Sequence, residues 1–245
     1  FDFNGINFTE SGALNRVLDS MLSEWEREYG IVTDVPQEYG LRFYRILQAA
    51  AEQTGRGAVV LVDEYDKPLL DVLERDPELL DRNRDILKAF YSVFKQADAS
   101  LRFVFLTGVT KFSQVSVFSG FNQPKDISMF DKYEALCGIT EEELYTQFAE
   151  PIREMAESDG CSEEEIRLRL KRHYDGYHFS EGMTDIYNPF SVLNALDSRR
   201  IRDYWFTSGT PSYLIRLMNH FHEGIDELTN KYYLPDEFIN YKADV

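Results

Sequence analysis

The chain has 245 residues, of which 43% are hydrophobic and 14% aromatic, and its formal net charge is −17. This composition is typical of a folded globular protein, and without a run of about 18 apolar residues it excludes both a disordered chain and a membrane-spanning helix. The acidic charge repels the phosphate backbone of DNA and RNA, so nucleic acid is an unexpected partner for this segment.

Two cysteines and four histidines are present, without the spacings that structural zinc sites use. We therefore expect no structural metal. We expect a cytoplasmic protein, in which Cys137 and Cys161 are reduced rather than joined in a disulfide, because disulfides are rare in that compartment.

The first quarter of the chain predicts a short strand followed by two helices. Residues 1–4 resemble the last part of a strand. Apolar residues then recur at helical spacing from Leu14 to Trp25, and Gly30 ends that helix. A second amphipathic helix follows Pro36.

The next stretch is the one around which the chain is organised. Five small or branched apolar residues, 58–62, run without alternation and predict a parallel strand buried on both faces. Asp63 and Glu64 follow it directly, where ligands bind in an open α/β sheet. One carboxylate can hold Mg²⁺ through water, and its neighbour can orient or deprotonate a water beside a phosphate. This is the pattern of a Walker B strand, although acids before Pro68 can equally begin a turn or a helix.

A polar residue is expected at the same edge of the sheet. Pro77 precedes a long helix, and residues 101–106 form another mostly apolar strand that ends at Thr107. Strands alternating with helices predict an α/β fold with a parallel sheet. In P-loop ATPases the strand beside Walker B carries a polar sensor of the terminal phosphate, so Thr107 is a candidate sensor. A helix or turn cap is the alternative role.

A long polar segment follows. Residues 108–130 are rich in Gly, Ser, Asn and Lys, and a loop of that length at the carboxyl edge of a sheet is often functional. Thr110 and Lys111 are its candidate site residues. We assign residues 1–130 to an ATPase-like core.

Residues 131–245 predict a mainly helical lobe, lid-like or winged-helix-like, with a small β-hairpin. Thr140 and Glu143 have the spacing of a capping box, and Pro151 is expected to break or kink the helix that follows. Residues 175–187 contain short aromatic stretches around glycines and predict the hairpin. Asn188 then caps a further helix.

Several blocks of sequence together resemble one family. They are Val-Asp-Glu-Tyr-Asp-Lys-Pro at 62–68, Leu-Thr-Gly-Val-Thr-Lys-Phe-Ser at 106–113, Phe-Ser-Gly-Phe-Asn at 118–122, His-Tyr-Asp-Gly-Tyr-His-Phe at 173–179 and Tyr-Asn-Pro-Phe-Ser-Val-Leu at 187–193. Over nearly the whole chain, these blocks resemble the bacterial AAA-ATPase-like family. That family is similar to archaeal ATPases and regulatory NTPases, and it often carries a PD-(D/E)XK nuclease-like domain after the ATPase.

The resemblance implies a P-loop NTPase-like parallel sheet with flanking helices, with ATP and Mg²⁺ as ligands. It makes Asp63 the acid that coordinates Mg²⁺ through water and Glu64 the residue that activates water. Lys111 lies where the family has a basic residue, which implies a contact with the γ-phosphate.

The sequence departs from the family pattern at the phosphate-binding loop. No Gly-x-x-x-x-Gly-Lys-Ser/Thr occurs in residues 1–245, although such a Walker A loop cradles phosphates with backbone N–H groups and a lysine. The resemblance implies that this loop precedes Phe1 and that a nuclease-like domain follows Val245. We therefore expect the chain to be a segment of a longer protein.

Three functions can be proposed from the sequence. The leading hypothesis is an ATP-binding and ATP-hydrolysing domain that acts as a nucleotide-driven conformational switch. The alternative is a degenerate, nucleotide-free scaffold whose abundant Tyr and Phe bind a protein partner. A metal-dependent nuclease is disfavoured, because Tyr65 stands two residues before Lys67 where that motif needs an acid.

Overall fold

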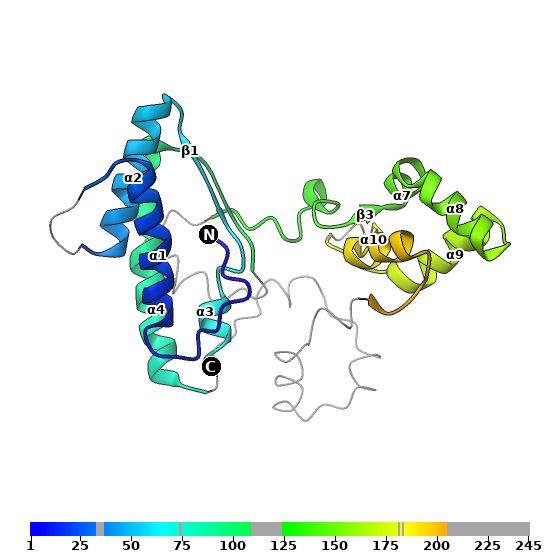
Figure 1. Ribbon diagram of the computed structural model, residues 1–245, viewed down its shortest axis with the longest axis horizontal. Helices are drawn as coiled ribbons and strands as arrows, with labels where there is room; N and C mark the ends of the chain where they lie inside the picture. Colours follow the sequence, from blue (N-terminus) through cyan, green and yellow to red (C-terminus); the bar gives the residue numbers. More distant parts are fainter. Residues whose placement is uncertain (33–36, 74, 109–123, 181, 183, 205–245) are drawn as a thin grey trace. The chain divides into compact units, whose positions relative to one another are not determined.

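The computed structural model describes residues 1–32, 37–73, 75–108, 124–180, 182 and 184–204 (Figure 1). The chain forms two compact units, and along the described residues the boundary between them falls between Pro124 and Lys125. Each unit has its own buried core. Within the described ranges, none of the helices has the length and apolar character needed to cross a bilayer.

The first unit alternates helices with two strands. Its described elements are α1 (Ala13–Glu28), α2 (Tyr39–Thr54), β1 (Ala58–Val62), α3 (Lys67–Leu70), α4 (Pro77–Tyr91), α5 (Val93–Gln96), the short helix η1 (Asp98–Ser100) and β2 (Leu101–Leu106). The Asp76 side chain caps α4 by accepting a hydrogen bond from the Leu79 N–H. These elements confirm the helices predicted from Leu14 to Trp25, after Pro36 and after Pro77.

The two strands pair in parallel, with Val62 opposite Leu106. Residues 1–3 add to the other edge of β1, where the Asp63 N–H donates to the Phe1 carbonyl at 2.8 Å and the Phe3 N–H donates to the Asp63 carbonyl at 3.3 Å. The order across the sheet is residues 1–3, β1 and β2. The predicted α/β class with parallel strands is confirmed, whereas the P-loop NTPase fold stays a prediction.

Helices cover one face of this sheet (Figure 1). Val60 and Val62 of β1 point into the core and are 6% and 1% exposed. Above them, Phe43 of α2 and Phe90 of α4 stack with their ring centroids 5.0 Å apart. The apolar side of α1 completes this layer with Leu14, Leu18 and Leu22.

The opposite face is exposed, so the expectation that β1 is buried on both faces is wrong. Val59 and Leu61 of β1 and Phe103 of β2 are 58%, 57% and 53% exposed, and we call these three residues the exposed sheet face. Residues 1–3, β1 and β2 follow one another across the sheet in one direction. Right-handed crossovers that advance in one direction place all their helices on the same face, which explains why no described helix covers the other.

A buried ion pair joins α1 to α2. Arg42 of α2 donates to Glu26 of α1 through two bonds, Nε to Oε1 at 2.8 Å and Nη2 to Oε2 at 2.7 Å. Its guanidinium also donates to Asp19 and to Ser23 of α1. Such a bidentate ion pair favours one register of α1 against α2, and each charge compensates the other, which would be costly to bury alone.

The second unit is mainly helical. Its described elements are η2 (Asp131–Tyr133), β3 (Ile139–Thr140), α7 (Glu141–Gln147), α8 (Ala149–Asp159), α9 (Glu163–Tyr174), β4 (Ile186–Tyr187) and α10 (Pro189–Ser198). The predicted capping box is confirmed, because the Thr140 hydroxyl accepts from the Glu143 N–H at 3.2 Å and Glu143 Oε2 accepts from the Thr140 N–H at 2.9 Å. The helix break falls at Phe148, which places Pro151 in the first turn of α8, where its missing N–H costs least.

The predicted hairpin over residues 175–187 is only partly correct. Tyr177 and Ile186 form one antiparallel bridge, the only pairing within this segment among its described residues. Instead β4 pairs antiparallel with β3. The Ile186 side chain lies directly against Gly138, so the absence of a Cβ at that position lets β4 approach β3 closely.

Candidate functional site

The carboxyl ends of β1 and β2 bring three of the predicted site residues together. Asp63 and Glu64 follow β1, and Thr107 follows β2 at the same edge. The Thr107 hydroxyl donates a hydrogen bond to Asp63 Oδ1 and accepts one from the Glu64 backbone N–H at 3.3 Å. One side chain therefore links both acidic residues across two strands.

The backbone turns at this edge. Glu64 has a φ of +53°, a left-handed conformation that is uncommon for residues other than glycine. The Lys67 N–H donates to the Glu64 carbonyl at 3.0 Å, which closes the turn that leads into α3. Asp63 thus keeps its strand pairing, whereas Glu64 is the first residue to leave the strand.

The two carboxylates lie in different environments. Asp63 is exposed, whereas Glu64 is partly buried. Burial is the main cause that raises the pKa of the Glu64 carboxyl above its usual value. The Lys67 ammonium opposes this rise in pKa, and the carboxylates of Asp63 and Asp66 add to it.

Asp2 also lies at this edge, although it is not among the site residues predicted from the sequence. It forms a parallel bridge with Asp63, and its charge also raises the pKa of the Glu64 carboxyl. The signal was present, since residues 1–4 were expected to end a strand. The acids that end neighbouring parallel strands meet at one edge.

The donor set at this edge fits a hydrated Mg²⁺ beside phosphate oxygens. Mg²⁺ keeps several waters and is held by one or two carboxylates together with substrate phosphates. Asp63 supplies an exposed carboxylate of that kind. Among the residues that the structure describes, no group of three or more His, Cys, Asp or Glu side chains could hold a metal ion by itself.

The first part of the chain is similar to one known family. Residues 1–118 match the family model described as a predicted AAA-ATPase. We call residues 1–118 the AAA-ATPase-like segment, because the similarity to this family covers only that part of the chain. This AAA-ATPase-like segment contains all of α1 to β2, and with them Asp63, Glu64 and Thr107.

A relative extends the likeness beyond the AAA-ATPase-like segment. A protein of Azotobacter chroococcum mcd 1, described as an uncharacterized protein in the vnfD 5′ region, is 40% identical over 216 residues. The match covers 88% of this chain and 39% of the relative, so the chain spans well under half of that protein. No solved structure matches the chain.

Two further candidates follow β2 in the AAA-ATPase-like segment. Thr110 and Lys111 lie outside the residues that the structure describes, so their proximity to Asp63 and Glu64 stays a prediction.

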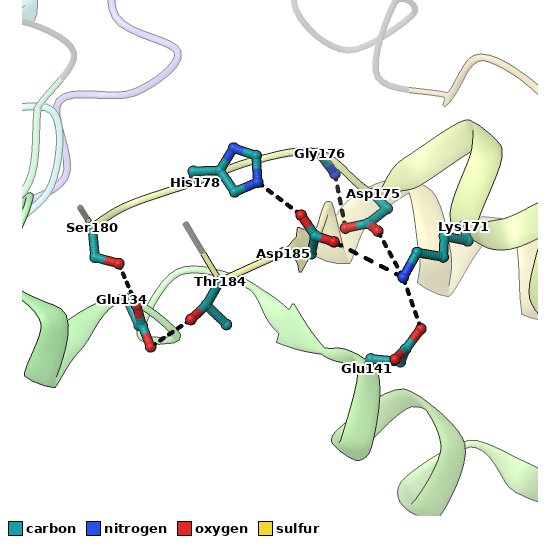
Figure 2. A network of polar contacts seen from close by, with 9 residues as sticks. All are labelled: Glu134, Glu141, Lys171, Asp175, Gly176, His178, Ser180, Thr184 and Asp185. Atoms are coloured by element: carbon teal, nitrogen blue, oxygen red, sulfur yellow. Dashed lines mark hydrogen bonds and ion pairs between the residues drawn. The ribbon is translucent and has the colours of Figure 1, made fainter. Parts of the chain in front are cut away.

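A separate cluster of polar side chains lies in the second unit (Figure 2). At the end of α9, Lys171 Nζ is 3.0 Å from Glu141 Oε1 and 3.7 Å from Asp175 Oδ2. The same ammonium lies 3.9 Å from Asp185 Oδ2, and His178 Nε2 lies 2.7 Å from the other oxygen of Asp185. Each of these three acids therefore faces a basic group.

A fourth acid of this cluster is held by hydroxyl groups. Glu134 accepts hydrogen bonds from Ser180 Oγ and from Thr184 Oγ1, the latter at 2.8 Å (Figure 2). These bonds, that of Ser180 first, lower the pKa of the Glu134 carboxyl, and the Lys171 hydrogen bond lowers that of Glu141. Acids that are kept ionised by local partners are typical of a structural network.

Proposed function

We propose that the AAA-ATPase-like segment supplies the acidic part of an ATP site and that the protein binds and hydrolyses ATP to switch its conformation. The observation that carries this proposal is the link through Thr107. Its hydroxyl contacts the Asp63 carboxylate and the Glu64 N–H at the carboxyl edge of two parallel strands. Ligands of open α/β sheets bind at that edge.

Each residue receives a role that its surroundings support. Bound Mg²⁺ would supply positive charge to the phosphates, with Asp63 holding it through water. Glu64 would orient or deprotonate the attacking water, and its raised pKa brings a carboxylate closer to the range of an effective base. Thr107 would fix the Asp63 carboxylate and the Glu64 backbone, because its hydroxyl contacts both.

The remaining parts of the site belong to the proposal as well. A Walker A loop before Phe1 would cradle the phosphates, and Lys111 would contact the γ-phosphate. The protein would act in the cytoplasm, and a nuclease-like domain after Val245 or a separate protein would respond to the switch.

Titration calorimetry on the full-length protein tests this function. Wild type should bind Mg-ATP and turn it over. Glu64→Gln should bind Mg-ATP with similar affinity and lose turnover by about 10²–10⁴-fold, the usual contribution of a general base. Absence of binding heat with Mg-ATP in the wild type would overturn the proposal.

A second function is favoured by the exposed sheet face. Val59, Leu61 and Phe103 present apolar area that a nucleotide does not need. As a nucleotide-free scaffold, the protein would bind a protein partner and would not respond to ATP. Unchanged partner binding in Asp63→Asn and Glu64→Gln, with no heat on adding Mg-ATP, would favour this function over the first.

A further inference from the structure

Contacts between the ends of β1 and β2 extend beyond Asp63 and Glu64. We call Asp63–Asp66 together with Thr107 and Gly108 the strand-end clasp. The Thr107 hydroxyl donates to the Asp63 carboxylate and accepts from the Glu64 backbone N–H, and the Tyr65 N–H donates to the Thr107 carbonyl at 2.9 Å. The Thr107 N–H in turn donates to the Val62 carbonyl at 2.9 Å.

Gly108 makes the closest approach in the clasp. A Cβ at this position would lie 2.5 Å from Tyr65 Cε1 and 2.7 Å from Asp66 Oδ1. Real Cβ atoms essentially never come within 3.0 Å of other heavy atoms, so any side chain here forces a shift.

The groups around Gly108 have little freedom to make room. The Tyr65 side chain is 8% exposed and Asp66 is fully buried at 0%. Interiors are close-packed, so a displaced ring or carboxylate must push its neighbours in turn. A Cβ at Gly108 would therefore displace the end of β2, which carries Thr107.

We infer that Tyr65, Asp66 and Gly108 are positioning residues that act through Thr107 to hold the Asp63 and Glu64 carboxylates in their working geometry. The inference rests on the proposed function, since it assigns a purpose to the clasp only if those acids meet ATP. None of the three positioning residues needs to contact the nucleotide.

The other end of the same strand pair provides a matched control. A Cβ at Gly57 would lie 2.9 Å from the Arg102 nitrogen and 2.9 Å from the Leu101 carbonyl carbon. Gly57 thus also leaves too little room for a Cβ, between the beginnings of β1 and β2 and remote from the acids. Gly57→Ala strains the strand pair without touching the clasp.

Kinetics on the full-length protein test the inference. Gly108→Ala should lower kcat for ATP by at least about tenfold, because small misplacements of reacting groups are costly, while KM changes less than about twofold. Gly57→Ala should keep kcat within about twofold of wild type. A double-mutant cycle with Thr107→Val should show that Gly108→Ala causes no further loss when the hydroxyl is absent. Equal kcat in Gly108→Ala and Gly57→Ala, or additive losses in the cycle, would overturn the inference.

A second measurement does not depend on turnover. Hydrogen exchange of the Tyr65 amide should accelerate in Gly108→Ala and stay unchanged in Gly57→Ala, and an unchanged rate in both would overturn the clasp. If Gly108→Ala does not fold, Tyr65→Leu, which removes the ring atoms pressed against Gly108, should give the same faster exchange and lower kcat. Wild type that neither binds nor hydrolyses Mg-ATP refutes the proposed function separately, and the exchange rates then decide whether the clasp exists.

Discussion

Carboxylates cluster in two regions of this molecule, and the pKa values of these groups shift in opposite directions in the two regions. In the second unit, Lys171 and the hydroxyl of Ser180 lower the pKa of Glu141 and Glu134, respectively. At the strand ends of the first unit, burial and neighbouring acids raise the pKa of Glu64. Acids held ionised by partners stabilise a fold, whereas an acid with a raised pKa beside other acids is a candidate for chemistry.

Exchanging acids for amides in the two regions should give the largest contrast. In the full-length protein, Glu64→Gln is expected to lower ATP turnover by about 10²–10⁴-fold, because it removes the proposed base. Glu141→Gln should leave turnover within about twofold, since it disturbs only the network around Lys171. Steady-state ATPase assays check both variants, and equal losses would show that the two groups of acids do not differ in function.

The first unit also contains a buried acid, Glu26, which is paired with Arg42 and should matter for stability rather than for turnover. Arg42→Met would leave Glu26 buried without its cation, and the expected cost is about 3–5 kcal/mol of unfolding free energy. Denaturant unfolding of the chain measures this loss. Glu24→Gln, an exposed acid on the same helix, serves as the control and should change stability by less than about 0.5 kcal/mol.

The capping box of α7 tests whether the acids of the second unit are structural. Thr140→Ala removes the acceptor for the Glu143 N–H and should cost about 1 kcal/mol of stability. It should also raise the pKa of Glu143, whose lowered value comes first from the Thr140 backbone and then from its hydroxyl. Thr140→Ser keeps the hydroxyl and should retain most of the stability in thermal unfolding.

The smallest effect is a dependence on pH. A carboxyl whose pKa is lower in the folded than in the unfolded state stabilises the fold above its unfolded pKa, and this stabilisation is lost as pH falls through the folded value. Glu134 and Glu141 have lowered pKa values, so the second unit should lose stability in acid.

Ser180→Ala isolates the contribution of one acid to this pH dependence. Removing the hydroxyl should move the pKa of Glu134 back towards its usual value, because the Ser180 bond is the main cause of the shift. Carboxyl carbon chemical shifts followed through an acid titration measure this pKa. An unshifted titration of Glu134 in Ser180→Ala would contradict the assigned cause.

Local patterns explain how much of the fold could be predicted. The apolar spacing from Leu14 to Trp25 gave α1, and the boundary residues Asn188 and Thr140 marked helix starts correctly. These signals lie within a few residues of the element that they specify. The order of strands and helices also gave the parallel pairing of β1 with β2.

The features that were missed depend on contacts between distant residues. A run of five apolar residues in β1 cannot reveal that the described helices cover only one face, because that follows from the direction in which strands are added. Similarly, β4 pairs with β3 rather than within its own segment, since Gly138 makes room for Ile186. For the site, the two strand ends predicted Asp63, Glu64 and Thr107 as neighbours, whereas the contact of Gly108 with Tyr65 depends on how residues 43 positions apart pack and leaves no local pattern in the sequence.

The exposed sheet face also has a consequence for the solubility of the chain. With a net charge of −17 at pH 7, molecules repel one another and keep Val59, Leu61 and Phe103 of different copies apart. That repulsion disappears near the isoelectric point, about pH 4.6, where apolar faces can meet. Precipitation should therefore set in as a preparation is acidified towards this pH, and Leu61→Lys should delay it without unfolding the protein.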